Sequence, residues 1–244
     1  MSAESLEQIY NSIAPRYAQG DGINDFYTMP IVKHFCPPAA NSVLEVCCGA
    51  GRIAVEIAKN VSTVWGIDLS SEMICYARRN ADMASNKPVF TQADLLAFDF
   101  GGQTFDYIYG VYFVTYFQVD ALLQKLIPLL NEGGRFLIID GTHGPGDPGA
   151  TPFRFRDLFR QYVDYTKFMQ RYGMSVNRLG WFVHRLKRRA LLASPGWRKV
   201  EGWKREHGNN TNSKIWTEQL LTILPNAKIE QITSRLVCAI WDRI

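Results

Sequence analysis

A glycine turn with acidic residues around it is the feature of this sequence most suited to chemistry. The stretch Val43–Arg52, VLEVCCGAGR, is an apolar run that leads into a glycine turn and the start of a helix. Glycines there let the backbone approach a ligand closely and present the amides of a helix N-terminus. Gly49–Ala54 also fits the dinucleotide pattern G-x-G-x-x-A. The loop alone leaves three alternatives: a dinucleotide site, a site for another nucleotide, and a turn that binds nothing.

Three acidic residues favour one of these alternatives. Glu45 precedes the glycines, where a carboxylate would repel a pyrophosphate but suits a cation such as the amino and sulfonium groups of S-adenosylmethionine. Asp68 ends the next apolar run and is placed to accept ribose hydroxyls. Asp94 follows the third predicted strand, where it can hold an adenine amino group, and NAD needs no such acid. Each acid alone is also an ordinary helix or turn cap, but together they favour S-adenosylmethionine.

Strands and helices alternate on both sides of this loop. Residues 4–35 predict two short helices broken at Gln19–Gly22. The predicted strands are 42–46, 63–67, 88–92, 105–111 and 135–140, and the predicted helices between them are 52–59, 70–80 and 120–130. Such alternation is typical of a parallel sheet with crossover helices. Two last strands, 228–233 and 236–241, are too close for a crossover and must pair as antiparallel neighbours.

These elements predict an α/β fold: a Rossmann-like doubly wound sheet, mostly parallel with an antiparallel last strand, and a helical insertion after the fifth strand. The 244 residues suit one domain. We expect an N-terminal helical cap (1–40), a cofactor-binding half (41–141), a basic aromatic insertion or lid (142–214) and closing strands (215–244). The five cysteines lack metal-ligand spacing, so we expect reduced thiols, no metal site and a cytoplasmic protein, with peripheral membrane contact as an open alternative.

The sequence resembles the class I S-adenosylmethionine-dependent methyltransferases over about Val43 to Asp140. The segment Tyr10–Tyr17, Y-x-x-I-A-x-x-Y, followed by ECCGAG, is similar to the ubiquinone/menaquinone methyltransferases and their small-molecule relatives. The family's first motif is usually acid-x-G-x-G-x-G, and Cys47 replaces its first glycine here. A Cys-Cys pair at this point is known among the quinone enzymes.

The resemblance implies the cofactor and a role for each position. S-Adenosylmethionine would be the methyl donor and S-adenosylhomocysteine the product. Glu45 and the backbone of Cys47, Gly49 and Gly51 would hold the methionine end. Asp68 would bind ribose, with Leu69 and Met73 on the adenine. Asp94, Leu95 and the Gly110 carbonyl would recognise the base edge, and Tyr17 would close over the ligand.

The acceptor is less well defined than the cofactor. His143 follows the fifth strand and is the best candidate for a general base, with Tyr112 as an accessory. A solvated loop histidine is the competing interpretation of His143. The Asp/Asn-Pro-Pro-aromatic signature of nucleic-acid amino methyltransferases is absent, which argues against a nucleic acid and for a small-molecule acceptor. The acceptor atom and the oligomeric state stay open.

Charge is concentrated in the predicted insertion. Residues 151–210 contain 14 Lys/Arg and 4 Asp/Glu, whereas the rest of the chain is net acidic. Basic and aromatic residues over 151–192 suit an anionic membrane surface or an acidic acceptor, and a lid with a solvated charged face is the alternative. We therefore expect methyl transfer to a small or amphipathic metabolite. Two alternatives are a lipid or quinone methyltransferase at a membrane surface and a regulatory protein that binds the cofactor without turnover; a dehydrogenase is a distant third.

Overall fold

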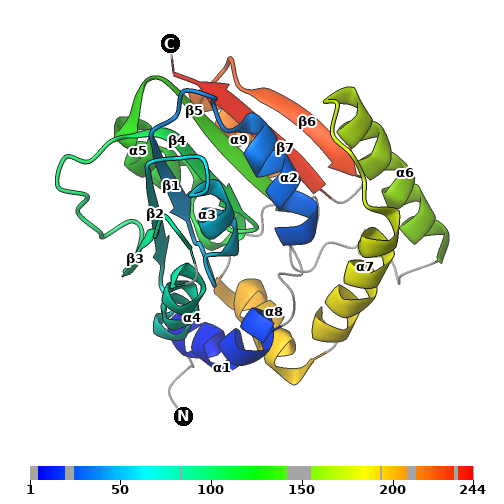
Figure 1. Ribbon diagram of the computed structural model, residues 1–244. Helices are drawn as coiled ribbons and strands as arrows, with labels where there is room; N and C mark the ends of the chain where they lie inside the picture. The colour runs from blue at the N-terminus through cyan, green and yellow to red at the C-terminus, as the bar shows by residue number, and fades with distance from the viewer. Residues whose placement is uncertain are drawn as a thin grey trace.

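Seven strands form a single sheet in the computed structural model, which describes residues 5–19, 25–82, 84–141, 155–192, 194–207, 213–233 and 236–243 (Figure 1). The strands are β1 (Ser42–Val46), β2 (Thr63–Asp68), β3 (Val89–Gln92), β4 (Phe105–Val111), β5 (Leu130–Gly141), β6 (Lys228–Thr233) and β7 (Leu236–Asp242). Their order is β3-β2-β1-β4-β5-β7-β6. The first five are parallel, and β7 pairs antiparallel with both β5 and β6. The predicted sheet and its antiparallel closure are confirmed.

Helices connect most of the parallel strands, except β3 and β4, and continue after β5. The helices are α1 (Leu6–Gln19), α2 (Asp25–Phe35), α3 (Arg52–Ile57), α4 (Ser71–Ala81), α5 (Val119–Leu126), α6 (Phe155–Arg171), α7 (Arg178–Leu192), α8 (Pro195–His207) and α9 (Ser213–Ile223), with 3-10 turns η1 (Val114–Tyr116) and η2 (Ile127–Leu129). Ser70 caps α4 by accepting the Met73 amide at 3.1 Å, as its sequence position predicts. Within the described ranges, none of these helices has the length and apolar character needed to cross a membrane.

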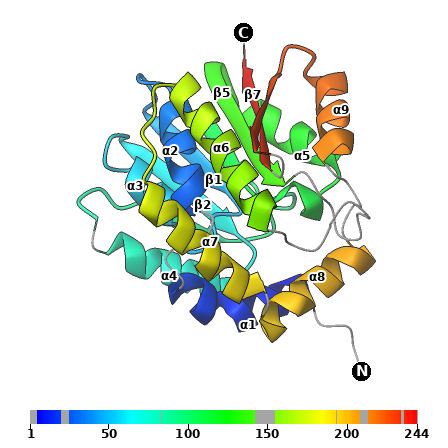
Figure 2. The ribbon, with the colours of Figure 1, turned by 90° about the vertical axis from the view of Figure 1, so that its right-hand side faces the viewer.

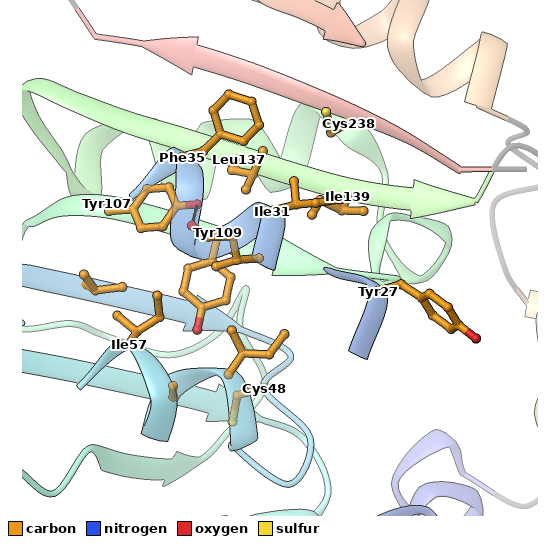
Figure 3. Packing of buried hydrophobic residues seen from close by; sticks show 14 of the residues in the cluster. Tyr27, Ile31, Phe35, Cys48, Ile57, Tyr107, Tyr109, Leu137, Ile139 and Cys238 are labelled. Atoms are coloured by element: carbon orange, nitrogen blue, oxygen red, sulfur yellow. Dashed lines mark hydrogen bonds between the residues drawn. The ribbon is translucent and has the colours of Figure 1, made fainter. Parts of the chain in front are cut away.

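Alternating side chains on the strands divide the core into two layers. Val43, Tyr107 and Leu137 face one side, where α2, α3, α6 and α7 cover the sheet. Leu44, Ile108 and Ile138 face the other side, under α5 and α9. Figure 2 shows the sheet between these helices, and Figure 3 shows Tyr107 and Tyr109 projecting from β4 into the first layer. Burial on both faces explains why the central strands are mostly apolar.

A third, smaller cluster joins α1, α4 and α8. Ile9, Ile13 and Ala14 of α1 pack with Met73 of α4 and Val200 of α8, and all five are buried. The three helices lie together at the lower edge of the molecule in Figure 1. The tyrosines of α1 contact the segments that follow β1 and β4, so α1 and α8 lie over the carboxyl edge of the sheet.

Strand β5 begins five residues before its predicted start at Arg135. The sequence Asn131-Glu132-Gly133-Gly134 reads as a helix stop, but Leu130 already pairs with Phe105 of β4. Gly133, at φ 72°, donates its amide to the Arg243 carbonyl at 2.8 Å, and Gly134 accepts from the Arg243 amide at 2.9 Å. The glycines therefore continue the sheet by binding the C-terminal segment, a pairing too distant in sequence for local reasoning to find.

Candidate active site

The loop after β1 is a tight turn whose residues adopt left-handed backbone. Cys47, Gly49 and Gly51 have φ values of 52°, 51° and 67°. The Cys48 amide donates to the Ile67 carbonyl at 3.0 Å, which fastens the turn to the end of β2. A Cβ on Gly51 would lie 2.6 Å from Phe90 Cε1, so only glycine fits there. The loop thus brings bare backbone to the carboxyl edge of the sheet, at the switch point between β1 and β4, where the strand order reverses.

Asp68 binds this loop to the second strand. Its Oδ2 accepts the Gly49 amide at 2.8 Å and its Oδ1 accepts the Ser70 amide at 2.9 Å. Burial raises the pKa of Asp68, although these amide bonds act in the opposite direction. The structure therefore places Asp68 at the loop, as predicted, with lone pairs left for ligand hydroxyls.

The charges of four carboxylates act on the thiol of Cys47. Burial raises the pKa of this thiol most, and the charges of Asp68, Asp94, Asp140 and Glu45 raise it further, which puts all four acids within electrostatic reach. Asp140, at the end of β5, is buried and accepts the Val114 amide at 2.7 Å and the Gly141 amide at 2.6 Å. Across the described residues, no lysine or arginine forms an ion pair with Asp68, Asp94 or Asp140. Such an edge of the sheet fits a cationic ligand, which would offset the cost of keeping these acids ionised.

Glu45 lies beneath the loop. Its side chain is buried, and Oε2 accepts the Ala54 amide at 2.9 Å, in the first turn of α3. The pKa of Tyr109 is raised by burial and then by the neighbouring Glu45 carboxylate. Glu45 therefore orders the start of α3, and its contact with a ligand amino group stays a prediction.

The remaining predicted cofactor residues divide into two groups. Leu69 is partly buried directly after β2, and Asp94 is exposed and caps its own turn by accepting the Leu96 amide at 2.9 Å. Met73 and Leu95 are instead buried in apolar clusters, Leu95 with residues of β1, β4 and α5 and Met73 with residues of α1 and α8. Gly110 lies inside the sheet, where a Cβ would come 2.6 Å from Val46 Cγ2. Their contacts with the base stay predictions.

Tyr17 and Tyr112 both lie at the carboxyl edge of the sheet. A Cβ on Gly49 would meet Tyr17 Cε1 at 3.6 Å, so the Tyr17 ring already covers the glycine loop. Tyr112, directly after β4, has φ 58° and donates its amide to the Ile139 carbonyl at 2.8 Å. Left-handed backbone at a tyrosine stores strain of about 1–2 kcal/mol, as residues at functional sites often do. His143 lies outside the described residues.

Four residues at this edge were not among the predicted site residues. Asp140 ends β5, and Tyr10 of α1 hydrogen-bonds Tyr116 of η1 through their hydroxyls. Lys204 of α8 lies over the Tyr116 ring, 5.0 Å from its centroid. The position of Asp140 at a strand end was available as a signal, in the way that Asp68 was. The other three come from helices more than 85 residues apart, and no local pattern joins them.

Cys47 provides a test of the loop's conformation. Because φ 52° favours glycine over any residue with a Cβ, we expect Cys47→Gly to be more stable than Cys47→Ala by about 1 kcal/mol, the reverse of the usual order. Both variants remove the thiol, so its packing cancels in the comparison. Urea unfolding of the two variants measures the difference. Greater stability of the alanine variant would mean that Cys47 is not left-handed in solution.

Comparisons with known proteins bear on this geometry. A family model described as a methyltransferase domain matches residues 43–134. The chain is 30% identical over 167 residues to the 2-phytyl-1,4-naphtoquinone methyltransferase of Synechocystis sp., covering 62% of this chain and 68% of that protein. It is 28% identical over 163 residues to the demethylmenaquinone methyltransferase of Porphyromonas gingivalis, covering 62% and 66%. The aligned segment thus spans about two thirds of these relatives.

Solved structures support the fold. An O-methyltransferase family protein from Burkholderia thailandensis superposes with a TM-score of 0.59 at 16% identity, covering 99% of this chain and 64% of that one. The DhpI–SAM–HEP complex superposes with a TM-score of 0.58 at 14% identity, covering 98% of each chain. At these identities the likeness concerns the fold. Together with the sequence relatives and the carboxylate-lined loop, it identifies the cofactor as S-adenosylmethionine.

Proposed function

The chain belongs to the class I S-adenosylmethionine-dependent methyltransferases, and we propose that it methylates an apolar aromatic acceptor of the quinol type. The observation that carries the acceptor class is a group of aromatic rings at the carboxyl edge of the sheet. Tyr116 meets Tyr10 edge-on with ring centroids 5.9 Å apart and lies 6.2 Å from Trp203. Such rings favour a flat apolar molecule. The names of the relatives, which concern naphthoquinones and menaquinone, agree with this class.

Apart from one base, the residues of the site would bind and orient the two reactants. The backbone of the glycine loop and Asp68 would hold the cofactor, and Tyr17 would cover it. When bound, S-adenosylmethionine supplies an electrophilic methyl group. The protein's contribution is alignment for in-line displacement and exclusion of water.

The chemistry of the acceptor requires its reduced form. A quinone ring carbon is electron-poor, whereas the ring carbon beside a quinol oxyanion can donate an electron pair to the methyl group. A carbon–carbon bond then forms, the electron pair of the broken carbon–sulfur bond stays on sulfur, and the ring proton leaves to a base. Tyr112 and His143 remain our candidates for that base.

An exposed apolar surface on α6 and α7 supports access to a lipid phase. Phe159 and Leu179 are 61% and 77% exposed, and Phe182 and Val183 are also exposed. The ring centroids of Phe182 on α7 and Tyr162 on α6 lie 5.3 Å apart, so the two helices contact each other here. Figure 2 shows α6 and α7 as neighbours. The α7 sequence has five lysines and arginines and no acid. Apolar side chains beside cations suit an anionic bilayer, in which an apolar quinol would be dissolved.

Label transfer tests this proposal. Purified protein would be given methyl-labelled S-adenosylmethionine and 2-phytyl-1,4-naphthoquinone in anionic phospholipid vesicles, with and without dithionite. We expect label in the organic extract only when the quinone is reduced. With vesicles of neutral lipid, or with Phe182→Ser, we expect slower transfer and unchanged cofactor affinity.

Other outcomes would overturn parts of the proposal. Equal rates of label transfer with neutral and anionic vesicles would show that the protein does not bind an anionic membrane surface. Label confined to the aqueous fraction of a cell extract would mean that the acceptor is a polar molecule and not a quinol. Tight cofactor binding with no label in any fraction would favour the non-catalytic regulatory protein instead.

A further inference from the structure

Lys204 differs from the other cations of its helix because it faces inward. Its side chain is only 15% exposed, whereas Arg198 and Arg205 are exposed. The Lys204 Nζ lies 5.0 Å from the centroid of the Tyr116 ring and 5.8 Å from that of Trp197. A lysine this covered costs desolvation energy, which aromatic faces offset in part.

The position of Lys204 is set by the packing of α8. Val200, one turn earlier on the same face, is fully buried against Ile9 and Ile13 of α1. A Cβ on Gly196 would come 2.6 Å from Ile13 Cγ2, so the two helices approach closely at the start of α8. Figures 1 and 2 both show α8 lying against α1. Lys204 is therefore held at a fixed place over the carboxyl edge of the sheet.

The groups around Lys204 belong to three other elements. The Tyr10 hydroxyl on α1 hydrogen-bonds the Tyr116 hydroxyl on η1. Burial and then the charge of Tyr116 raise the pKa of Tyr10, while the Lys204 ammonium lowers it, so the ammonium lies within electrostatic reach of this hydroxyl pair. The same ammonium acts on Asp140 at the end of β5. Lys204 thus lies beside the tyrosine pair, and its charge reaches the strand end that carries one of the four carboxylates.

Lys204 keeps hydrogen-bonding capacity for a ligand. Within the part of the chain that the structure describes, its one ion pair is with Glu201 Oε1 on the same helix, at 3.7 Å, beyond hydrogen-bonding distance. An ammonium has three donors. In the tyrosine pair one hydroxyl donates to the other. The proton of the second hydroxyl can then be donated to an oxygen of a ligand.

We propose that Lys204 and the Tyr10–Tyr116 hydroxyl pair bind the oxyanion of the acceptor, with the acceptor ring lying against Tyr116 and Trp197. The acceptor hydroxyl loses its proton to water, and the resulting oxyanion pairs with the Lys204 ammonium and accepts a hydrogen bond from the hydroxyl pair. This inference rests on the proposed function and defines its substrate class more narrowly: an aromatic ring with an ionisable hydroxyl. The oxyanion places electron density on the ring carbon that receives the methyl group.

Binding of two naphthalene probes tests the proposal without turnover. The probes are 1,4-dihydroxynaphthalene, kept reduced with dithionite, and 1,4-dimethoxynaphthalene, which cannot ionise; both are titrated by tryptophan fluorescence with S-adenosylhomocysteine present. We expect Lys204→Met to weaken binding of the dihydroxy probe about tenfold or more. Its affinity for the dimethoxy probe should stay within about twofold of the wild-type value. Lys204→Arg should restore most of the affinity. Tyr10→Phe should weaken binding of the dihydroxy probe alone. Arg205 is an exposed neighbour of Lys204, and Arg205→Met should change the affinity for neither probe.

A merely structural Lys204 would give a different pattern. Equal losses for both probes, or a weaker affinity for S-adenosylhomocysteine in Lys204→Met, would mean that the lysine only fastens α8 to η1, and would overturn the proposal. Wild-type protein that methylates reduced quinone with the same KM as Lys204→Met would overturn this inference alone. Wild-type protein that transfers no label to a quinol would overturn the proposed function first.

Discussion

Asp68→Ala is expected to weaken the binding of S-adenosylhomocysteine about 100-fold. Each hydrogen bond from a ligand hydroxyl to a carboxylate contributes about 1.5–3 kcal/mol, and a loss of about 2.7 kcal/mol corresponds to that factor. The change also removes Asp68 Oδ2, which accepts the Gly49 amide at 2.8 Å and so helps to hold the loop in place. Calorimetric titration measures the affinity, and the neutral product is a suitable ligand because it does not react.

Asp82→Ala is the matched control for Asp68→Ala. Asp82 follows α4 and is exposed, with Lys87 as its ion-pair partner at 3.1 Å, so its loss should leave the affinity unchanged. The affinity of Asp68→Asn for S-adenosylhomocysteine should fall between those of the two alanine variants, because asparagine keeps one acceptor oxygen. If Asp68→Ala bound the ligand within threefold of wild type, the nucleoside would have to lie elsewhere on the protein.

Gly51→Ala is expected to destabilise the protein by about 3 kcal/mol or more. The left-handed φ of 67° costs an alanine about 1–2 kcal/mol, and the new methyl group would overlap Phe90 Cε1 at 2.6 Å and Ala77 Cβ at 2.9 Å. Overpacking of this kind costs about 1–3 kcal/mol. Phe90 is buried in β3 and cannot move freely. The free energy of unfolding in urea measures the effect.

Gly102→Ala separates backbone strain from crowding. Gly102 also has left-handed backbone, at φ 79°, but a Cβ there would meet nothing within 4 Å. We expect the free energy of unfolding of this variant to fall by only about 1 kcal/mol. Equal losses for Gly51→Ala and Gly102→Ala would show that the glycine loop does not pack against β3 as described.

The parts of the site that were predictable are those set by short stretches of sequence. Asp68 ends an apolar run, and the carboxyl ends of neighbouring parallel strands must meet at one edge. The glycine turn after β1 was predictable for the same reason. Cys47 was correctly placed in the loop, but its left-handed backbone was not evident from a cysteine.

The parts that were not predictable depend on packing between distant segments. The packing of Met73 in a cluster with residues of α1 and α8 is one example, because neither helix lies near Met73 in the sequence. Its contact with the adenine stays a prediction. Lys204 was one of 14 positive residues in a basic segment, and only the docking of Val200 on α1 turns it inward. The early start of β5 likewise depends on Arg243, more than 100 residues away.

The most direct measurement is photochemical labelling with methyl-labelled S-adenosylmethionine followed by peptide mapping. The central claim is that this cofactor lies on the glycine loop, under Tyr17 and beside Asp68. We expect the label on peptides that contain residues 43–52 or Tyr17, and its loss when excess S-adenosylhomocysteine is added or when Asp68 is replaced by alanine. Label on α6 or α7 instead, or label that the product does not displace, would contradict the account.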